Sequence, residues 1–158
     1  MELIFIYKFV HVLGASVLFG TGLGIAYFMF MAHRTGHAGV IAVTLRFVVL
    51  ADFIFTATAV VVQPVSGVLL AWSIGLSPLE ESWIVLSLLL YALVGLCWLP
   101  VVFMQIRMRN LAHDAAVNSK PLPDAYRRLF RIWFVLGWPA FAGVIAIFAL
   151  MTWQPRWW

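Results

Sequence analysis

The stretch WIVLSLLLYALVGLCWLPVVFMQI, residues 83–106, decides the fold. It runs for 24 residues without a charged side chain. A helix needs about 20 apolar residues to cross the hydrocarbon core of a bilayer, where only helices and closed barrels satisfy their own backbone groups. The stretch therefore predicts a membrane-spanning helix, with Pro100 as an internal kink.

Three further apolar stretches, residues 3–32, 40–76 and 132–153, repeat this pattern along the chain. The stretch 40–76 is too long for one straight span, and Pro64 within it removes a backbone donor, which bends a helix. We expect a kink there, followed by an outer extension of the helix. Together, the four stretches predict an all-α, transmembrane four-helix bundle that forms a single integral membrane domain over residues 1–158.

The composition supports this prediction and excludes several functions. Apolar residues make up 65% of the chain and charged residues only 10%, whereas a soluble domain has about 25% charged residues. So few charges cannot cover a water-soluble surface, and the net charge of +4 therefore does not indicate a nucleic-acid partner. The single cysteine, Cys97, excludes an intramolecular disulfide. The sequence has no motif for phosphate transfer, hydrolysis or zinc binding, since GxxxxGK[ST], GxSxG, HExxH and CxxC are all missing.

The distribution of Lys and Arg predicts the orientation of the helices. The connection 107–131 holds six of these residues, and the connection 33–39 holds Arg34, whereas the connection 77–82 holds only Glu80 and Glu81. Positively charged loops stay on the cytoplasmic side. We therefore expect an N-out, C-out protein in contact with membrane lipid, whose tail is anchored at the outer interface by Trp153, Trp157 and Trp158.

Ionisable groups inside a bilayer are costly, so each is a candidate for function. Lys8 and His11 share one helix face, and the helical rise places Asp52 at a comparable depth on the next span. We therefore expect Asp52 to contact Lys8 or His11, with Lys8 and Asp52 as a buried polar pair. Alternatively, Lys8 reaches the interface, and Asp52 and His11 only form hydrogen bonds between helices.

His11 is also a candidate axial ligand of haem b, since imidazole is a common ligand of haem iron. The same stretch carries Ser16, Gly20 and Gly24 at intervals of four residues. Small residues allow a flat macrocycle to approach the backbone, but they also allow another helix to do so. The second interpretation predicts a homo-oligomer or a partner membrane subunit on this ridge.

Two arginines near the expected inner helix ends, Arg46 and Arg131, are candidates for holding an anionic group, such as a haem propionate or a lipid phosphate. Alternatively, they only determine topology. A copper site is a further alternative, because thioether and imidazole groups suit copper. The residues at this boundary are Met29, Met31, His33, His37, Met104, Met108 and His113. The simpler interpretation of these residues is a solvated cytoplasmic rim.

Four segments, 8–36, 49–67, 97–112 and 129–151, resemble a bacterial family of predicted four-helix integral membrane proteins whose function is not established. That family is remotely similar to the haem-dependent membrane protoporphyrinogen oxidases and to the copper-resistance-D-like proteins. The shared features are a KxxH pattern, a proline late in the second helix and an FR…P pattern, matched here by Lys8, His11, Pro64, Phe130, Arg131 and Pro139.

This resemblance implies a multi-pass protein of the bacterial inner (plasma) membrane, and it implies haem binding only for His11. The oxidases have an Asn-Glu pair where this chain has Gly137 and Trp138, and a lysine where it has Ile84 and Val85. Our first hypothesis is therefore a small b-type haem-binding membrane protein in electron transfer or haem handling. The alternatives are an accessory or structural subunit without cofactor, and copper handling.

Overall fold

The computed structural model describes residues 2–158, and within this range all regular structure is helical. The helices are α1 (Glu2–Thr35), α2 (Ala38–Ala51), the π-helical stretch η1 (Asp52–Thr56), α3 (Ala57–Ser73), α4 (Ser82–Val117) and α5 (Asp124–Trp153). Because α2, η1 and α3 follow one another without a break, the chain has four long helices, each long and apolar enough to cross a membrane. The prediction of an all-α bundle of four transmembrane helices is confirmed.

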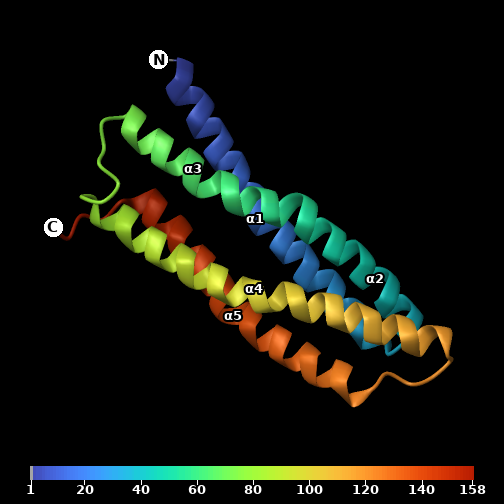
Figure 1. Cartoon of the computed structure of the whole chain (residues 1–158). Helices are drawn as coiled ribbons and strands as arrows, with labels where there is room; N and C mark the ends of the chain where they lie inside the picture. Colours follow the sequence, from blue (N-terminus) through green and yellow to red (C-terminus); the bar gives the residue numbers. More distant parts are fainter. Residues whose placement is uncertain (1) are drawn as a thin grey trace.

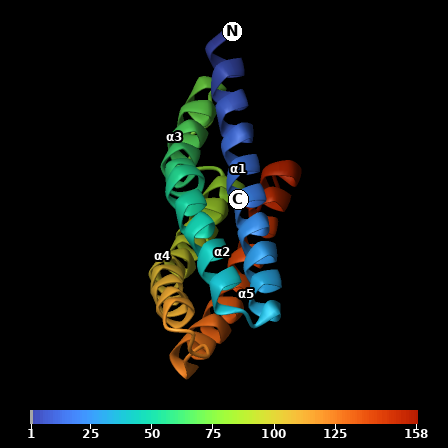
Figure 2. The ribbon, with the colours of Figure 1, turned by 90° about the vertical axis from the view of Figure 1, so that its right-hand side faces the viewer.

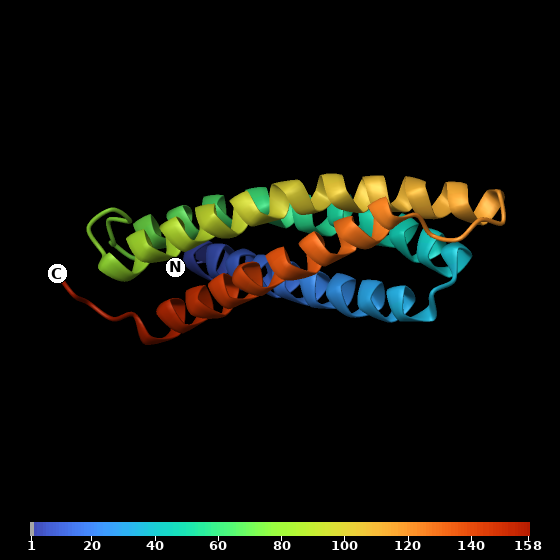
Figure 3. The same ribbon diagram turned by 90° about the horizontal axis from the view of Figure 1, so that it is seen from below.

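Both chain termini lie at the same end of the elongated bundle (Figures 1 and 3), which we call the terminal end. The connection 74–81 lies there too. The connections 36–37 and 118–123 lie at the opposite end, which we call the basic end. Helix α1 packs along α3, α4 packs along α5, and α2 packs against both α1 and α4, an arrangement that Figure 2 shows from the side.

The helices extend well beyond their apolar stretches at the basic end. The sequence predicts a long connection over residues 107–131, but α4 continues to Val117 and α5 begins at Asp124. These extensions are amphipathic: Met108, Ala112 and Ala115 are buried at spacings of four and three residues. The apolar pattern of the sequence identifies only the membrane-spanning part of such a helix, because the last turns of the helix have a polar face toward water.

The irregular part of the second transmembrane helix is not at Pro64, where the sequence predicts the kink. The helix continues through Pro64 to Ser73, and the departure from α-helical geometry lies at Asp52–Thr56. Such π-helical stretches are uncommon and occur frequently at functional sites. The most unusual backbone of the bundle therefore coincides with its buried carboxylate, Asp52.

Most tight packing lies in the basic half of the molecule. One core cluster there joins α1, α2, α4 and α5 through Ile25, Met29, Ala32, Ile41, Leu45, Val48, Met108, Ala112, Tyr126, Phe130 and Trp133. A smaller cluster of Ala71, Trp83 and Ile84 lies at the terminal end. Between the two, the ring of Phe19 on α1 meets the edges of Phe141 and Phe148 on α5.

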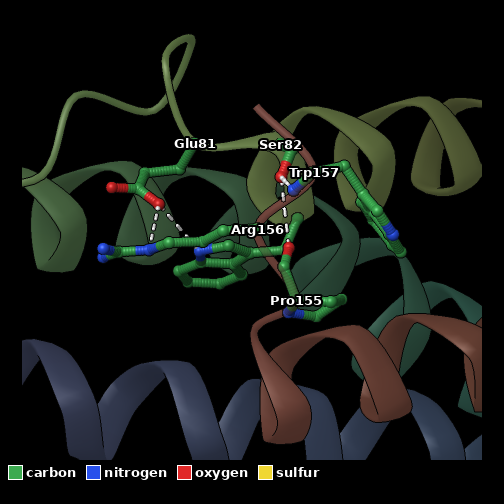
Figure 4. Close-up of polar contacts among 6 residues, drawn as sticks. Glu81, Ser82, Pro155, Arg156 and Trp157 are labelled. Carbon is green, nitrogen blue, oxygen red and sulfur yellow. Dashed lines mark hydrogen bonds and ion pairs between the residues drawn. The ribbon is translucent and has the colours of Figure 1, made fainter.

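At the terminal end, the tail after α5 folds over the start of α4 (Figure 4). The fully buried Ser82 hydroxyl donates to the carbonyl oxygen of Pro155 and accepts the N–H of Trp157, both at 3.1 Å. Glu81 Oε2 lies 3.2 Å from Arg156 Nε and accepts the indole N–H of Trp83. These contacts fix the last residues of the chain on the bundle.

Candidate functional site

His11 lies in the interface between α1 and α3, half-buried. Its Nδ1 is 3.2 Å from both the carbonyl oxygen of Gln63 and the hydroxyl of Ser66, and its Nε2 is 3.4 Å from the amide nitrogen of Gln63. A carbonyl oxygen only accepts, so Nδ1 carries the proton and Nε2 accepts from Gln63. Both ring nitrogens are therefore engaged with α3.

Gly67 provides the space for the His11 ring. A Cβ atom at position 67 would lie 2.9 Å from His11 Cε1, closer than side-chain atoms normally approach. On the other helix, a Cβ at Gly14 would lie 2.5 Å from Gln63 Oε1. The two glycines allow a histidine and a glutamine to pack between closely spaced helices. This arrangement is that of a polar contact between helices.

In this conformation His11 is not free to bind haem iron. Iron would bind the Nε2 lone pair, which points at the Gln63 amide. The suggested propionate partners are also far away. Arg131 lines the same cavity as His33, and His33 is 22 residues beyond His11 on α1, about 33 Å along the helix. Arg46 lies on the exposed side of α2. The structure does not bring His11, Arg46 and Arg131 together.

Lys8 and Asp52 are also apart. Lys8 is exposed, Asp52 is only 3% exposed, and the one ion pair among residues 2–158 joins Arg156 to Glu81. The depth argument fails because the helices are 30 to 36 residues long, far more than a minimal span. His11 is therefore level with Gln63 on the neighbouring helix, and Asp52 lies much closer to the basic end.

Asp52 lies instead in a polar cluster between the transmembrane helices. The side chains of Thr56, Trp98 and Gln105 surround its carboxyl group, and the Trp98 indole N–H approaches Oδ1 at 3.4 Å. Three oxygens of this cluster are buried without a hydrogen-bond partner: Asp52 Oδ2, Thr56 Oγ1 and Gln105 Oε1. Such groups are costly inside a membrane and indicate a site of function or of stored strain.

Sequence reasoning missed the partners Gln63, Ser66, Trp98 and Gln105. One signal was available, because Gln63 and Gln105 are amides within otherwise apolar stretches. Each needs a polar neighbour in lipid, so each predicts a contact between helices. Which helix supplies that contact depends on the tertiary arrangement.

The small-residue ridge of Ser16, Gly20 and Gly24 faces away from the bundle. Ser16 and Gly20 are exposed, and a Cβ at Gly20 or Gly24 would meet no other part of the chain within 4 Å. The Ser16 hydroxyl donates to the carbonyl oxygen of Val12 in its own helix, so it needs no outside partner. The ridge therefore serves no packing contact within the chain.

The suggested copper residues lie in different surroundings. Met29 and Met108 are fully buried in the apolar core cluster, whereas His37 and His113 are exposed. Among residues 2–158, no three His, Cys, Asp or Glu side chains converge as a metal site would require. His33 stacks on Phe130 with ring centroids 3.6 Å apart, and its Nδ1 is 3.3 Å from the Tyr126 hydroxyl.

Four long apolar helices with exposed apolar side chains define the class: an all-helical integral membrane protein. Comparison with known families agrees, because residues 5–155 match the family described as "Predicted integral membrane protein (DUF2269)". The chain belongs to this family. No curated protein and no solved structure matches it.

Proposed function

We propose that this protein is a non-enzymatic accessory membrane protein that forms a homodimer. The two copies dock on each other through the ridge of Ser16, Gly20 and Gly24. The observation that carries the proposal is the empty space around the ridge. Helices associate in lipid through close packing rather than through the hydrophobic effect, and small residues four apart allow their backbones to approach.

Other helical glycines support this assignment by contrast. A methyl group added at Gly14, Gly22, Gly67 or Gly143 would lie within 4 Å of a side chain from a neighbouring helix. These glycines are accounted for by packing within the chain, and the ridge is not. Two glycines in the middle of other helices, Gly95 and Gly137, are open like Gly20, but neither has a small residue four positions away.

A second copy is the partner that the ridge fits best. The same ridge on two chains is self-complementary, and paired identical surfaces related by a two-fold axis are the commonest way in which proteins associate. A partner of a different sequence would need a matching small-residue helix of its own. The proposal therefore commits to a homodimer through α1.

The test is the oligomeric state of the full chain in lipid nanodiscs or mild detergent, measured by single-molecule photobleaching or cross-linking. Gly20→Leu should convert the dimer to monomer, while Gly95→Leu, an equally open glycine on α4, should leave it intact. A wild-type monomer, or equal loss in both variants, would refute the proposal.

Haem binding by His11 is the second candidate, and one observation favours it. An apolar cavity of about 310 Å³ lies between α1 and α3, and Ser66, which contacts His11, lines it. When bound, haem would supply one-electron chemistry. His11 would first have to leave Gln63 and Ser66. Absorption spectra of oxidised and reduced protein from haem-replete cells, with His11→Ala beside wild type, decide this point. A colourless, folded wild type would exclude haem.

A further inference from the structure

A cavity of about 390 Å³ lies at the basic end, where the end of α1 meets the start of α5. It is lined by His33 and Gly36 from α1 and the turn after it, by Pro121 and Leu122 from the connection before α5, and by Arg127 and Arg131 from α5. Three of these six residues have side chains that are or can become cationic, and none is acidic. We infer that this cavity binds a phosphate group, most readily that of an anionic lipid.

Within residues 2–158, the two arginines of the cavity, Arg127 and Arg131, have no counter-ion. Arg127 and Arg131 are four residues apart on α5, so their side chains emerge on the same face. Neither forms an ion pair, since the one ion pair within residues 2–158 is that of Arg156 and Glu81 at the terminal end. Like charges at this spacing destabilise a helix, and a bound anion between the two guanidinium groups removes that cost.

His33 is held in place to complete the site. Its ring stacks on Phe130 with an angle of 10° between the planes, and its Nδ1 faces the hydroxyl of the fully buried Tyr126 at 3.3 Å. A buried tyrosine hydroxyl needs an acceptor, and Nδ1 is the partner available. If Tyr126 donates to Nδ1, Nε2 carries the proton and offers a donor for a ligand oxygen.

The chemistry of these groups selects phosphate. Guanidinium groups bind phosphate oxygens with paired, charge-assisted hydrogen bonds, and a histidine N–H adds a third direction. Pro121 and Leu122 provide an apolar wall, which suits the apolar part of a lipid better than a free ion.

The test is native mass spectrometry of the full chain in mild detergent, with phosphatidylglycerol, diacylglycerol and inorganic phosphate as separate probes. Phosphatidylglycerol should bind, and diacylglycerol, which lacks the phosphate, should not. Arg127→Gln/Arg131→Gln should weaken binding by at least about tenfold, since two charge-assisted hydrogen bonds are lost. Arg107→Gln/Arg128→Gln removes the same charge at the same end, outside the cavity, and should retain binding.

The outcomes separate the sources of phosphate. Displacement of the lipid by inorganic phosphate at millimolar concentration would assign the cavity to a free phosphate, and no displacement would assign it to a lipid. Equal loss of binding in the two double variants would overturn the inference, because the attraction would then be a general effect of charge. Helical content by circular dichroism verifies that each variant is folded. His33→Gln keeps both arginines and should also weaken binding, because it removes the ring that is held in place by Phe130 and Tyr126.

Discussion

Tyr91 supplies the hydrogen bond that Pro64 removes. Its hydroxyl, on α4, donates at 2.7 Å to the carbonyl oxygen of Val60 on α3. In a regular helix that carbonyl accepts the N–H of the residue four positions later, which is Pro64 and has none. The helix therefore passes the proline because its neighbour satisfies the free carbonyl, as membrane helices with internal prolines require.

Removal of this hydroxyl should destabilise the protein. Tyr91→Phe is expected to cost about 1 kcal/mol, the usual size of a hydrogen bond between membrane helices. In a Pro64→Ala background, residue 64 regains its N–H and Val60 its helical partner, so Tyr91→Phe should cost much less. Reversible unfolding in mixed micelles measures both effects. An equal cost in both backgrounds would contradict the pairing of Tyr91 with Pro64.

The polar cluster of Asp52 makes a second prediction. Asp52→Asn keeps an acceptor for Trp98 and adds donors for the unpartnered oxygens of Thr56 and Gln105, so it should be at least as stable as wild type. Asp52→Leu leaves the Trp98 indole N–H without its acceptor and adds no donor for these oxygens, so it should cost about 2 kcal/mol. The same unfolding measurement compares the two variants. If both lose stability equally, the cluster needs the carboxylate itself, as a cation site would.

The effect of a substitution at Gly67 on stability should depend on whether His11 is present. Gly67→Ala places a methyl group 2.9 Å from His11 Cε1, and overpacking of this kind costs about 1–3 kcal/mol. In a His11→Ala background the methyl group occupies free space, so Gly67→Ala should be nearly neutral. Destabilisation that persists without the histidine ring would show that Gly67 is required for another reason.

Substitution of Ser82 should loosen the C-terminal tail more than substitution of Glu81. Ser82→Ala leaves the Pro155 carbonyl and the Trp157 N–H without their buried partner, whereas Glu81→Gln affects a pair whose Arg156 side chain is 67% exposed. Amide hydrogen exchange at Trp157 should accelerate by at least about tenfold in Ser82→Ala. Ser73→Ala, whose hydroxyl bonds only its own helix, is the control and should leave that amide protected.

The number and apolar character of the helices can be predicted from the sequence alone. In hydrocarbon, every span must satisfy its own backbone hydrogen bonds. Residues 83–106 could have no other structure in lipid. The ends of the helices are harder to predict, since Met108 and Ala112 continue α4 through packing that depends on α5. The N-out orientation stays a prediction from the Lys and Arg distribution.

The site is harder to predict than the fold. The depths of His11 and Asp52 are wrong when they are counted from the ends of minimal spans. The helices are 30 to 36 residues long, and this length changes which residues of neighbouring helices are level by several turns. His11 therefore contacts Gln63 rather than Asp52, and Lys8 has no carboxylate partner among the described residues. Residue type identifies His11 and Asp52 as noteworthy, but their partners depend on which helices are neighbours.

The position of the main core cluster has a consequence for biosynthesis. Tyr126, Phe130 and Trp133 come from α5, which leaves the ribosome after α1 to α4, and they pack on Met29 and Met108 from these earlier helices. The first three spans therefore enter the bilayer before the aromatic side chains that complete this cluster exist. Until α5 is inserted, these earlier helices are held in lipid only by their contacts with one another, and a nascent chain arrested before residue 124 lacks the side chains that close the basic half of the core.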